Sequence, residues 1–125
     1  MEKLTAYVPL VARVLIGALF LIAGAGKLSD VAGFTGFLTS GGLPGFLAWP
    51  SILFEIALGV AMIAGYQTRI MALLGAGFCV LAGLLYHFNP ADQMQMTMFL
   101  KNLAIAGGFL MIFVHGPGKA AVDRA

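Results

Sequence analysis

The chain has 125 residues, of which 61% are hydrophobic and only 10% are charged. Soluble domains average roughly 45–50% apolar and about 25% charged residues, so a water-soluble fold of this size could not bury so much apolar surface. The net charge of +2, from seven Lys/Arg against five Asp/Glu, is spread thinly along the chain, which argues against nucleic-acid binding.

Four apolar segments meet or approach the length of about 20 residues that a membrane-spanning helix needs. We predict spans over residues 8–26, 49–66, 69–86 and 98–114. The second and third spans are joined by so few residues that they must be antiparallel neighbours. The sequence therefore predicts an all-α membrane protein, a single domain over residues 1–125 folded as a four-transmembrane-helix bundle.

The connection between the first and second spans is the long one. Val31, Phe34, Phe37 and Leu38 recur there at helical spacing, before a run of glycine, serine and proline over residues 40–45. This pattern predicts a short interfacial helix at the membrane surface, followed by a turn that re-enters the membrane.

The cationic residues fall mostly on one side of the predicted bundle: Lys3, Arg13, Arg69, Lys119 and Arg124, against Lys27 and Lys101 on the other side. Because positive residues concentrate on the cytoplasmic side, both termini are expected to be cytoplasmic.

A weak internal repeat relates the two halves of the chain. Arg13 and Arg69 open the first and third spans, and Glu55 and Lys101 occupy similar positions in the second and fourth. Each half would then be one helical hairpin, related to the other by an axis along the membrane normal.

Five polar side chains fall together at the outer end of this topology: Lys27, Glu55, His87, Lys101 and Asn102. Charged groups in a membrane cost roughly 2.5–3.5 kcal/mol each at mid-helix and usually pair inside the bundle. This set can neutralise its carboxylate and keep spare donors, which suits a ligand with carbonyl or anionic oxygens. Alternatively, Glu55 and Lys101 form a structural salt bridge while Lys27 extends to the head groups.

Arg13 and Arg69 form a charged layer on the inner side. An arginine near a helix start can reach lipid phosphate, which is the favoured interpretation for Arg69, whereas the deeper Arg13 fits a functional role equally well. Cys79 is the only cysteine, and His87 has no partner at ligand spacing, so no metal site is expected. No catalytic constellation is recognisable, which leaves open whether the protein is an enzyme.

The ordered polar positions at the span ends resemble those of the DoxX family: Arg13-Val-Leu-Ile-Gly17, Gly24-Ala-Gly26-Lys27-Leu28, Glu55-Ile-Ala-Leu-Gly59, Gly65-Tyr-Gln-Thr68-Arg69 and Leu100-Lys101-Asn102-Leu103. The resemblance covers essentially the whole chain. It implies a four-helix bundle in the bacterial inner membrane.

The resemblance implies function more loosely. The member that gives the family its name is similar to a subunit of an archaeal thiosulfate:quinone oxidoreductase. Some bacterial members are linked to oxidative stress alongside soluble partner proteins. We therefore expect no intrinsic cofactor but a bound quinone or similar lipophilic carbonyl ligand, held at the layer of Lys27, Glu55, Lys101 and Asn102. The expected partners are the lipid bilayer and redox proteins, and a homo-oligomer is left open. The alternatives are a scaffold that recruits partner proteins and a small-molecule carrier.

Overall fold

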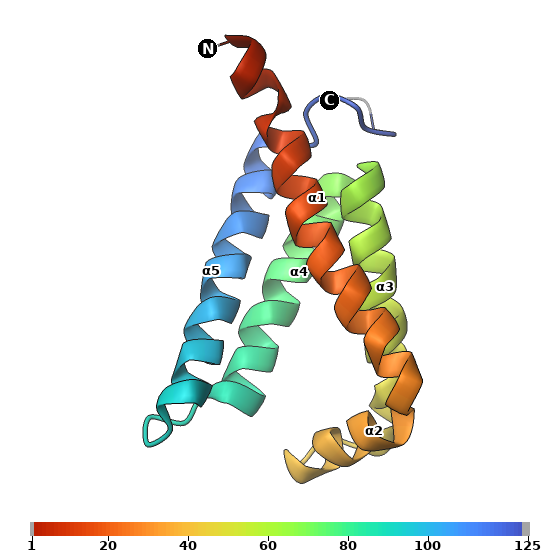
Figure 1. The fold of residues 1–125 in the computed structure, drawn as a ribbon, viewed down its shortest axis with the longest axis vertical. Helices are drawn as coiled ribbons and strands as arrows, with labels where there is room; N and C mark the ends of the chain where they lie inside the picture. The colour runs from red at the N-terminus through yellow and green to blue at the C-terminus, as the bar shows by residue number, and fades with distance from the viewer. Residues whose placement is uncertain (1, 124–125) are drawn as a thin grey trace.

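The computed structural model describes residues 2–123, which form helices and no strands. Its helical stretches include four that are long and apolar enough to cross a membrane. They contain α1 (Glu2–Lys27), α3 (Ala48–Ala64), α4 (Thr68–Ala82) with the π-helical turn η3 (Gly83–His87), and α5 (Gln93–His115) (Figure 1). The predicted all-α, four-helix membrane fold is confirmed.

The second predicted span ends earlier than expected. Gly65 adopts a left-handed conformation, with φ of 72°, and its N–H bonds to the carbonyl of Ala61. A glycine in this conformation terminates a helix because it can leave the right-handed path without steric cost. The third span then starts at Thr68, and both termini lie at the same end of the bundle (Figure 1). That this end is cytoplasmic stays a prediction.

The connection between α1 and α3 contains the expected short helix, α2 (Val31–Ser40), between the turns η1 (Leu28–Asp30) and η2 (Gly45–Leu47). The Asp30 carboxylate caps α2 by accepting a hydrogen bond of 2.9 Å from the N–H of Gly33. Helix α2 lies at the end of the bundle opposite both termini (Figure 1). Its position at the membrane surface stays a prediction.

The helices pack mainly as two pairs, α1 with α3 and α4 with α5. These are the two hairpins that the internal repeat predicts, although the symmetry between them stays a prediction. Helices α3 and α4 share a short turn but touch much less than the paired helices do. The pairs run apart toward the end that carries α2 (Figure 1).

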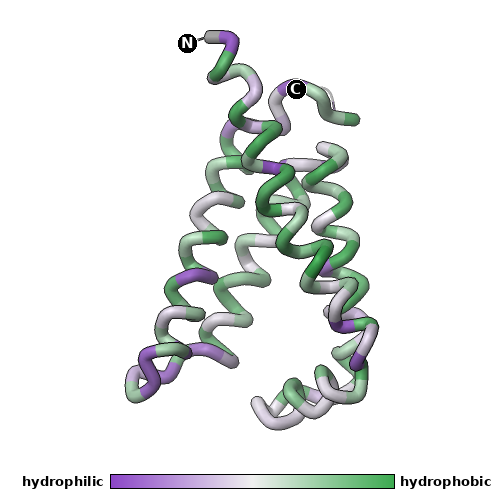
Figure 2. Tube along the Cα trace, viewed as in Figure 1, coloured by the Kyte–Doolittle hydropathy of each residue, from purple (hydrophilic) through white to green (hydrophobic). Residues whose placement is uncertain are grey.

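A compact core lies between the helices and an apolar surface faces outward. Phe20, Leu58, Met62, Phe109 and Ile112 are buried in this core. Many other large hydrophobic side chains are exposed, and Figure 2 shows hydrophobic residues along all the helices with hydrophilic positions mainly near their ends. Such a surface is stable only in lipid, where helices satisfy their own backbone polar groups.

Glycine lets α1 and α3 approach closely. A Cβ atom added at Gly59 would lie 2.6 Å from the backbone nitrogen of Leu21 and 2.7 Å from the carbonyl oxygen of Gly17. Because these neighbours are backbone atoms, they cannot rotate away as a side chain could. Contacts between small residues of this kind drive helix association in membranes.

Replacing Gly59 with alanine is therefore expected to destabilise the protein by about 1–3 kcal/mol, the usual cost of overpacking. The matched control is Gly77→Ala, since a Cβ atom there would meet nothing within 4 Å. Thermal unfolding in detergent measures both. Equal midpoints for the two variants would show that the close approach of α1 and α3 is not needed.

Candidate functional site

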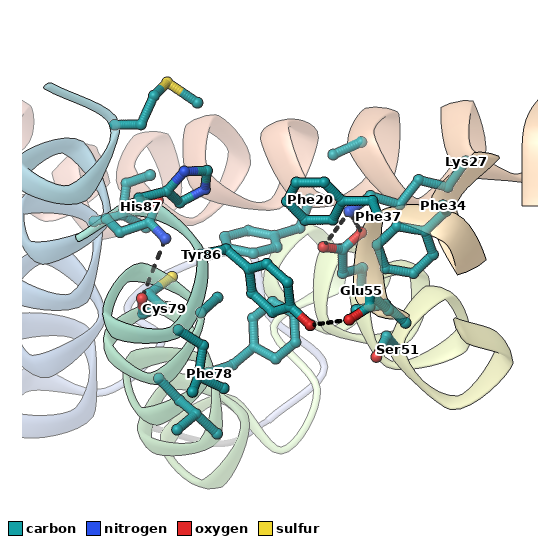
Figure 3. A pocket seen from close by; sticks show the side chains of 18 of the residues that line it. Phe20, Lys27, Phe34, Phe37, Ser51, Glu55, Phe78, Cys79, Tyr86 and His87 are labelled. Carbon is teal, nitrogen blue, oxygen red and sulfur yellow. Dashed lines mark hydrogen bonds and ion pairs between the residues drawn. The ribbon is translucent and has the colours of Figure 1, made fainter. Parts of the chain in front are cut away.

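A cavity of about 600 Å³ opens between the two helix pairs at the α2 end of the bundle. Its lining includes all five polar residues that the sequence brought together: Lys27, Glu55, His87, Lys101 and Asn102. Most of the remaining lining is apolar, with the aromatic side chains of Phe20, Phe34, Phe37, Phe78 and Tyr86 (Figure 3). The cavity thus combines an apolar body with a few polar groups, the usual composition of a small-molecule site.

An ion pair between Lys27 and Glu55 lies on one side of the cavity. The ammonium nitrogen is 2.7 Å from each carboxylate oxygen, and it also lies 4.8 Å from the centre of the Phe34 ring (Figure 3). The Glu55 side chain is 7% exposed and that of Lys27 is 30% exposed, so the lysine is the accessible partner. The alternative in which Glu55 pairs with Lys101 while Lys27 reaches the head groups is wrong.

The packing of α1 against α3 explains this choice of partner. Gly24 lies one turn before Lys27, and a Cβ atom there would come within 3.1 Å of the Cβ atom of Glu55. The missing side chain lets the end of α1 approach Glu55 closely. Lys27 is also the last residue of α1, where the helix dipole favours a cation.

The other polar groups lie on α4, η3 and α5. The amide nitrogen of Asn102 donates a 3.2 Å hydrogen bond to the carbonyl oxygen of Cys79. Nδ1 of His87 lies 2.8 Å from the side-chain oxygen of Gln95. Because that oxygen can only accept, Nδ1 carries the hydrogen, and in a neutral ring Nε2 is then an acceptor. Lys101 forms no ion pair within the described chain, residues 2–123.

Tyr86 is one of the cavity residues that the sequence analysis missed. Its hydroxyl donates a 2.8 Å hydrogen bond to the carbonyl oxygen of Leu38, and its ring stacks on Phe37 with centroids 4.7 Å apart. A Cβ atom at Gly41 would collide with the Tyr86 ring, so glycine makes room for it. Tyr86 thereby connects η3 to α2 beside the cavity. A tyrosine at the end of a predicted span is ordinarily an interfacial residue, which hid this role.

Arg13 lies at the opposite end of the bundle, and its side chain is 0% exposed. Its guanidinium donates five hydrogen bonds of 2.8–3.2 Å to backbone carbonyl oxygens, those of Met62, Ile63, Pro117, Lys119 and Ala120. It therefore binds α1 to the end of α3 and to the segment after α5. Contact with lipid phosphate, one of the two interpretations left open for Arg13, is wrong, because the residue is buried and bonded to backbone carbonyls.

Arg69, the other member of the predicted inner layer, is exposed at the start of α4. It lies beside the segment after α5, where a Cβ atom at Gly116 would come 2.8 Å from its guanidinium. The two arginines thus have different environments despite their similar positions in the sequence. Contact between Arg69 and lipid phosphate stays a prediction.

Substituting Arg13 with lysine keeps the charge but removes the planar group that reaches several carbonyls at once. Because buried acceptors would lose their donors, the change should destabilise the protein by about 2 kcal/mol or more. The matched control is Arg69→Lys, which should stay within about 0.5 kcal/mol of the parent, as exposed substitutions usually do. Thermal unfolding in detergent provides the comparison, and equal effects at both positions would contradict the structural role of Arg13.

Asp123 caps the start of α4 from a distant part of the chain. Its carboxylate accepts hydrogen bonds of 2.8 Å from the N–H of Gln67 and 2.7 Å from the N–H of Thr68. The pKa of Asp123 is lowered, chiefly by the hydrogen bond from the Thr68 backbone. The positive end of the α4 dipole also favours a carboxylate here. This cap and the Arg13 contacts hold the segment after α5 on the bundle.

This cap should depend on pH. Because the pKa of Asp123 is lower in the folded protein, its contribution to stability is complete above the ordinary aspartate pKa of about 3.9 and is lost as the pH falls below that value. Asp123→Asn should therefore be less stable than the parent at neutral pH, and the difference should disappear in acid. Thermal midpoints of both proteins across pH test this, and a pH-independent difference would contradict it.

Comparison with known proteins places the chain in a family. Residues 8–88 match the DoxX family. The chain is 43% identical over 124 residues to inner membrane protein YqjF of Escherichia coli, an alignment that covers 99% of this chain and 95% of that protein. It is 28% identical over 122 residues to inner membrane protein YphA of the same organism, an alignment that covers 92% of this chain and 87% of that protein. No solved structure matches it. The chain belongs to the DoxX family and is an integral membrane protein.

Proposed function

We propose that this protein is an inner-membrane subunit that binds a quinone, or a similar lipophilic molecule with carbonyl oxygens, for a membrane-associated redox or oxidative-stress system. The observation that supports the proposal is the cavity of about 600 Å³, in which an apolar, aromatic lining surrounds polar groups from both helix pairs. Ligand sites in proteins have volumes of about 300–1,000 Å³ and this mixture of groups.

The cavity offers hydrogen-bond donors for carbonyl oxygens. An ammonium group has three N–H donors, and the contacts of Lys27 with the two oxygens of Glu55 leave one for a ligand. Asn102 uses one N–H on the carbonyl of Cys79 and keeps another. Lys27 and Asn102 belong to different helix pairs, so a ligand with two carbonyl groups can be held from both sides. The electrons of a quinone reaction would come from a redox partner protein.

The position of the ion pair favours a ligand site over a pure scaffold. A charge pair that only fixes helix register would be expected to lie in a closed cluster. The Lys27–Glu55 pair instead lines the cavity, and its lysine is partly exposed. An accessible charge pair beside an empty apolar volume can orient a ligand, which a closed pair cannot.

A double replacement, Lys27→Met with Glu55→Leu, separates the two functions. Apolar replacements of a buried ion pair are often neutral or stabilising, so the variant should fold. It should bind ubiquinone or menaquinone analogues at least about tenfold more weakly, since one charged hydrogen bond is worth about 1.5–3 kcal/mol. Equilibrium titration in lipid nanodiscs measures this, with Lys119→Met, which changes an exposed lysine, as the control. A stable variant that binds quinone as tightly as the parent would exclude a ligand role for the ion pair, and a parent protein that binds no quinone would exclude the ligand function and favour the scaffold.

A further inference from the structure

The cavity has one positive charge in excess. The charged side chains in its lining are Lys27, Glu55 and Lys101. Lys27 and Glu55 neutralise each other at 2.7 Å, whereas Lys101 has no ion-pair partner among residues 2–123. An exposed lysine without a counter-charge in the described chain therefore lines a mostly apolar cavity.

Lys101 lies within α5, directly after Leu100 and about two turns past Gln93, the first residue of the helix. Charged residues at such positions in membrane proteins are costly, and they usually pair with an opposite charge. The structure provides such a partner for Lys27 but not for Lys101. A ligand that carries a negative charge would supply it.

A hydrogen-bond donor beside Lys101 suits an anionic oxygen group. Asn102 follows Lys101 on α5, lines the same cavity and keeps an N–H that can donate to such a group. Hydrogen bonds to a charged group are stronger than neutral ones, and a site without water strengthens them further. One cation with a neutral hydrogen-bond donor beside it is enough to hold one negative charge.

Most of the rest of the cavity wall is hydrocarbon, apart from the neutral side chains of Ser51, Cys79 and Tyr86. The rings of Phe20 and Phe78 meet edge to face with centroids 6.4 Å apart, and Leu81, Leu85 and Ile105 also line the cavity. This wall suits an apolar ring or chain but offers no partner for a second charge. The chemistry of the whole cavity therefore matches a molecule with an apolar body and one charged end.

We infer that the ligand is a lipophilic acid whose single anionic oxygen group binds Lys101, while its apolar body lies against Phe20 and Phe78. This inference rests on the proposed function and narrows it from carbonyl ligands in general to their anionic members. Lys27, whose charge is neutralised by Glu55, then donates a hydrogen bond to a carbonyl oxygen of the ligand, and Lys101 forms an ion pair with its anionic group.

A matched pair of ligands tests the inference. One is an alkyl hydroxynaphthoquinone whose hydroxyl group is ionised at neutral pH, and the other is its uncharged methyl ether with the same ring, carbonyls and chain. In nanodiscs of zwitterionic phosphatidylcholine, the parent protein should bind the anion at least about tenfold more tightly. Lys101→Met should remove this preference by weakening only the anion, and Lys101→Arg should keep it. The control, Lys119→Met, changes an exposed lysine outside the cavity.

The outcomes distinguish this inference from the proposed function. Equal affinity of the parent protein for both ligands would overturn the inference and leave the proposed function standing. If neither ligand binds, the proposed function fails and the inference fails with it. A preference for the anion that survives in Lys101→Met would also overturn the inference, because another group of the protein would then bind the negative charge. Size-exclusion chromatography verifies folding, and Lys101→Gln replaces the methionine variant if that variant aggregates.

Discussion

The arrangement of the bundle depends on one buried guanidinium. A charge at this depth must be matched, and Arg13 is matched by five backbone carbonyls rather than by a carboxylate. Two of them, from Met62 and Ile63, lie at the end of α3, where carbonyls lack partners within the helix. The others come from the segment after α5. This one group thus joins α1, α3 and that segment at the end that carries both termini.

The opposite end of the bundle is organised differently. There the two helix pairs diverge around the cavity, and each brings its own polar groups: Lys27 and Glu55 from one pair, His87, Lys101 and Asn102 mainly from the other. Within the described residues, the contact of Tyr86 with α2 is a visible connection across this end. A molecule in the cavity would touch both pairs, so its binding energy would also act on their separation.

Hydropathy was sufficient to predict the helices, because a chain with so few charged residues has little alternative in lipid. The polar cavity residues could also be found, since charges inside spans are rare and converge. The partner of Glu55 was harder, because it depends on how closely Gly24 lets α1 approach α3. The role of Arg13 could not be predicted, since its partners are backbone carbonyls, which every residue has, and no residue type in the sequence marks them. Asp123 was missed because it lies beyond the last span.

The Arg13 contacts also have a consequence for biosynthesis. Helix α1 is synthesised first, but three of the carbonyls that bind Arg13 belong to Pro117, Lys119 and Ala120, which leave the ribosome only after every span has been made. Until then the carbonyls of Met62 and Ile63 are the only two of its five acceptors that α3 can supply, and water or lipid phosphate at the interface has to replace the other three. Insertion of α1 and its final packing are therefore separate events in time. The final packing can be completed only after the segment that follows α5 has been synthesised.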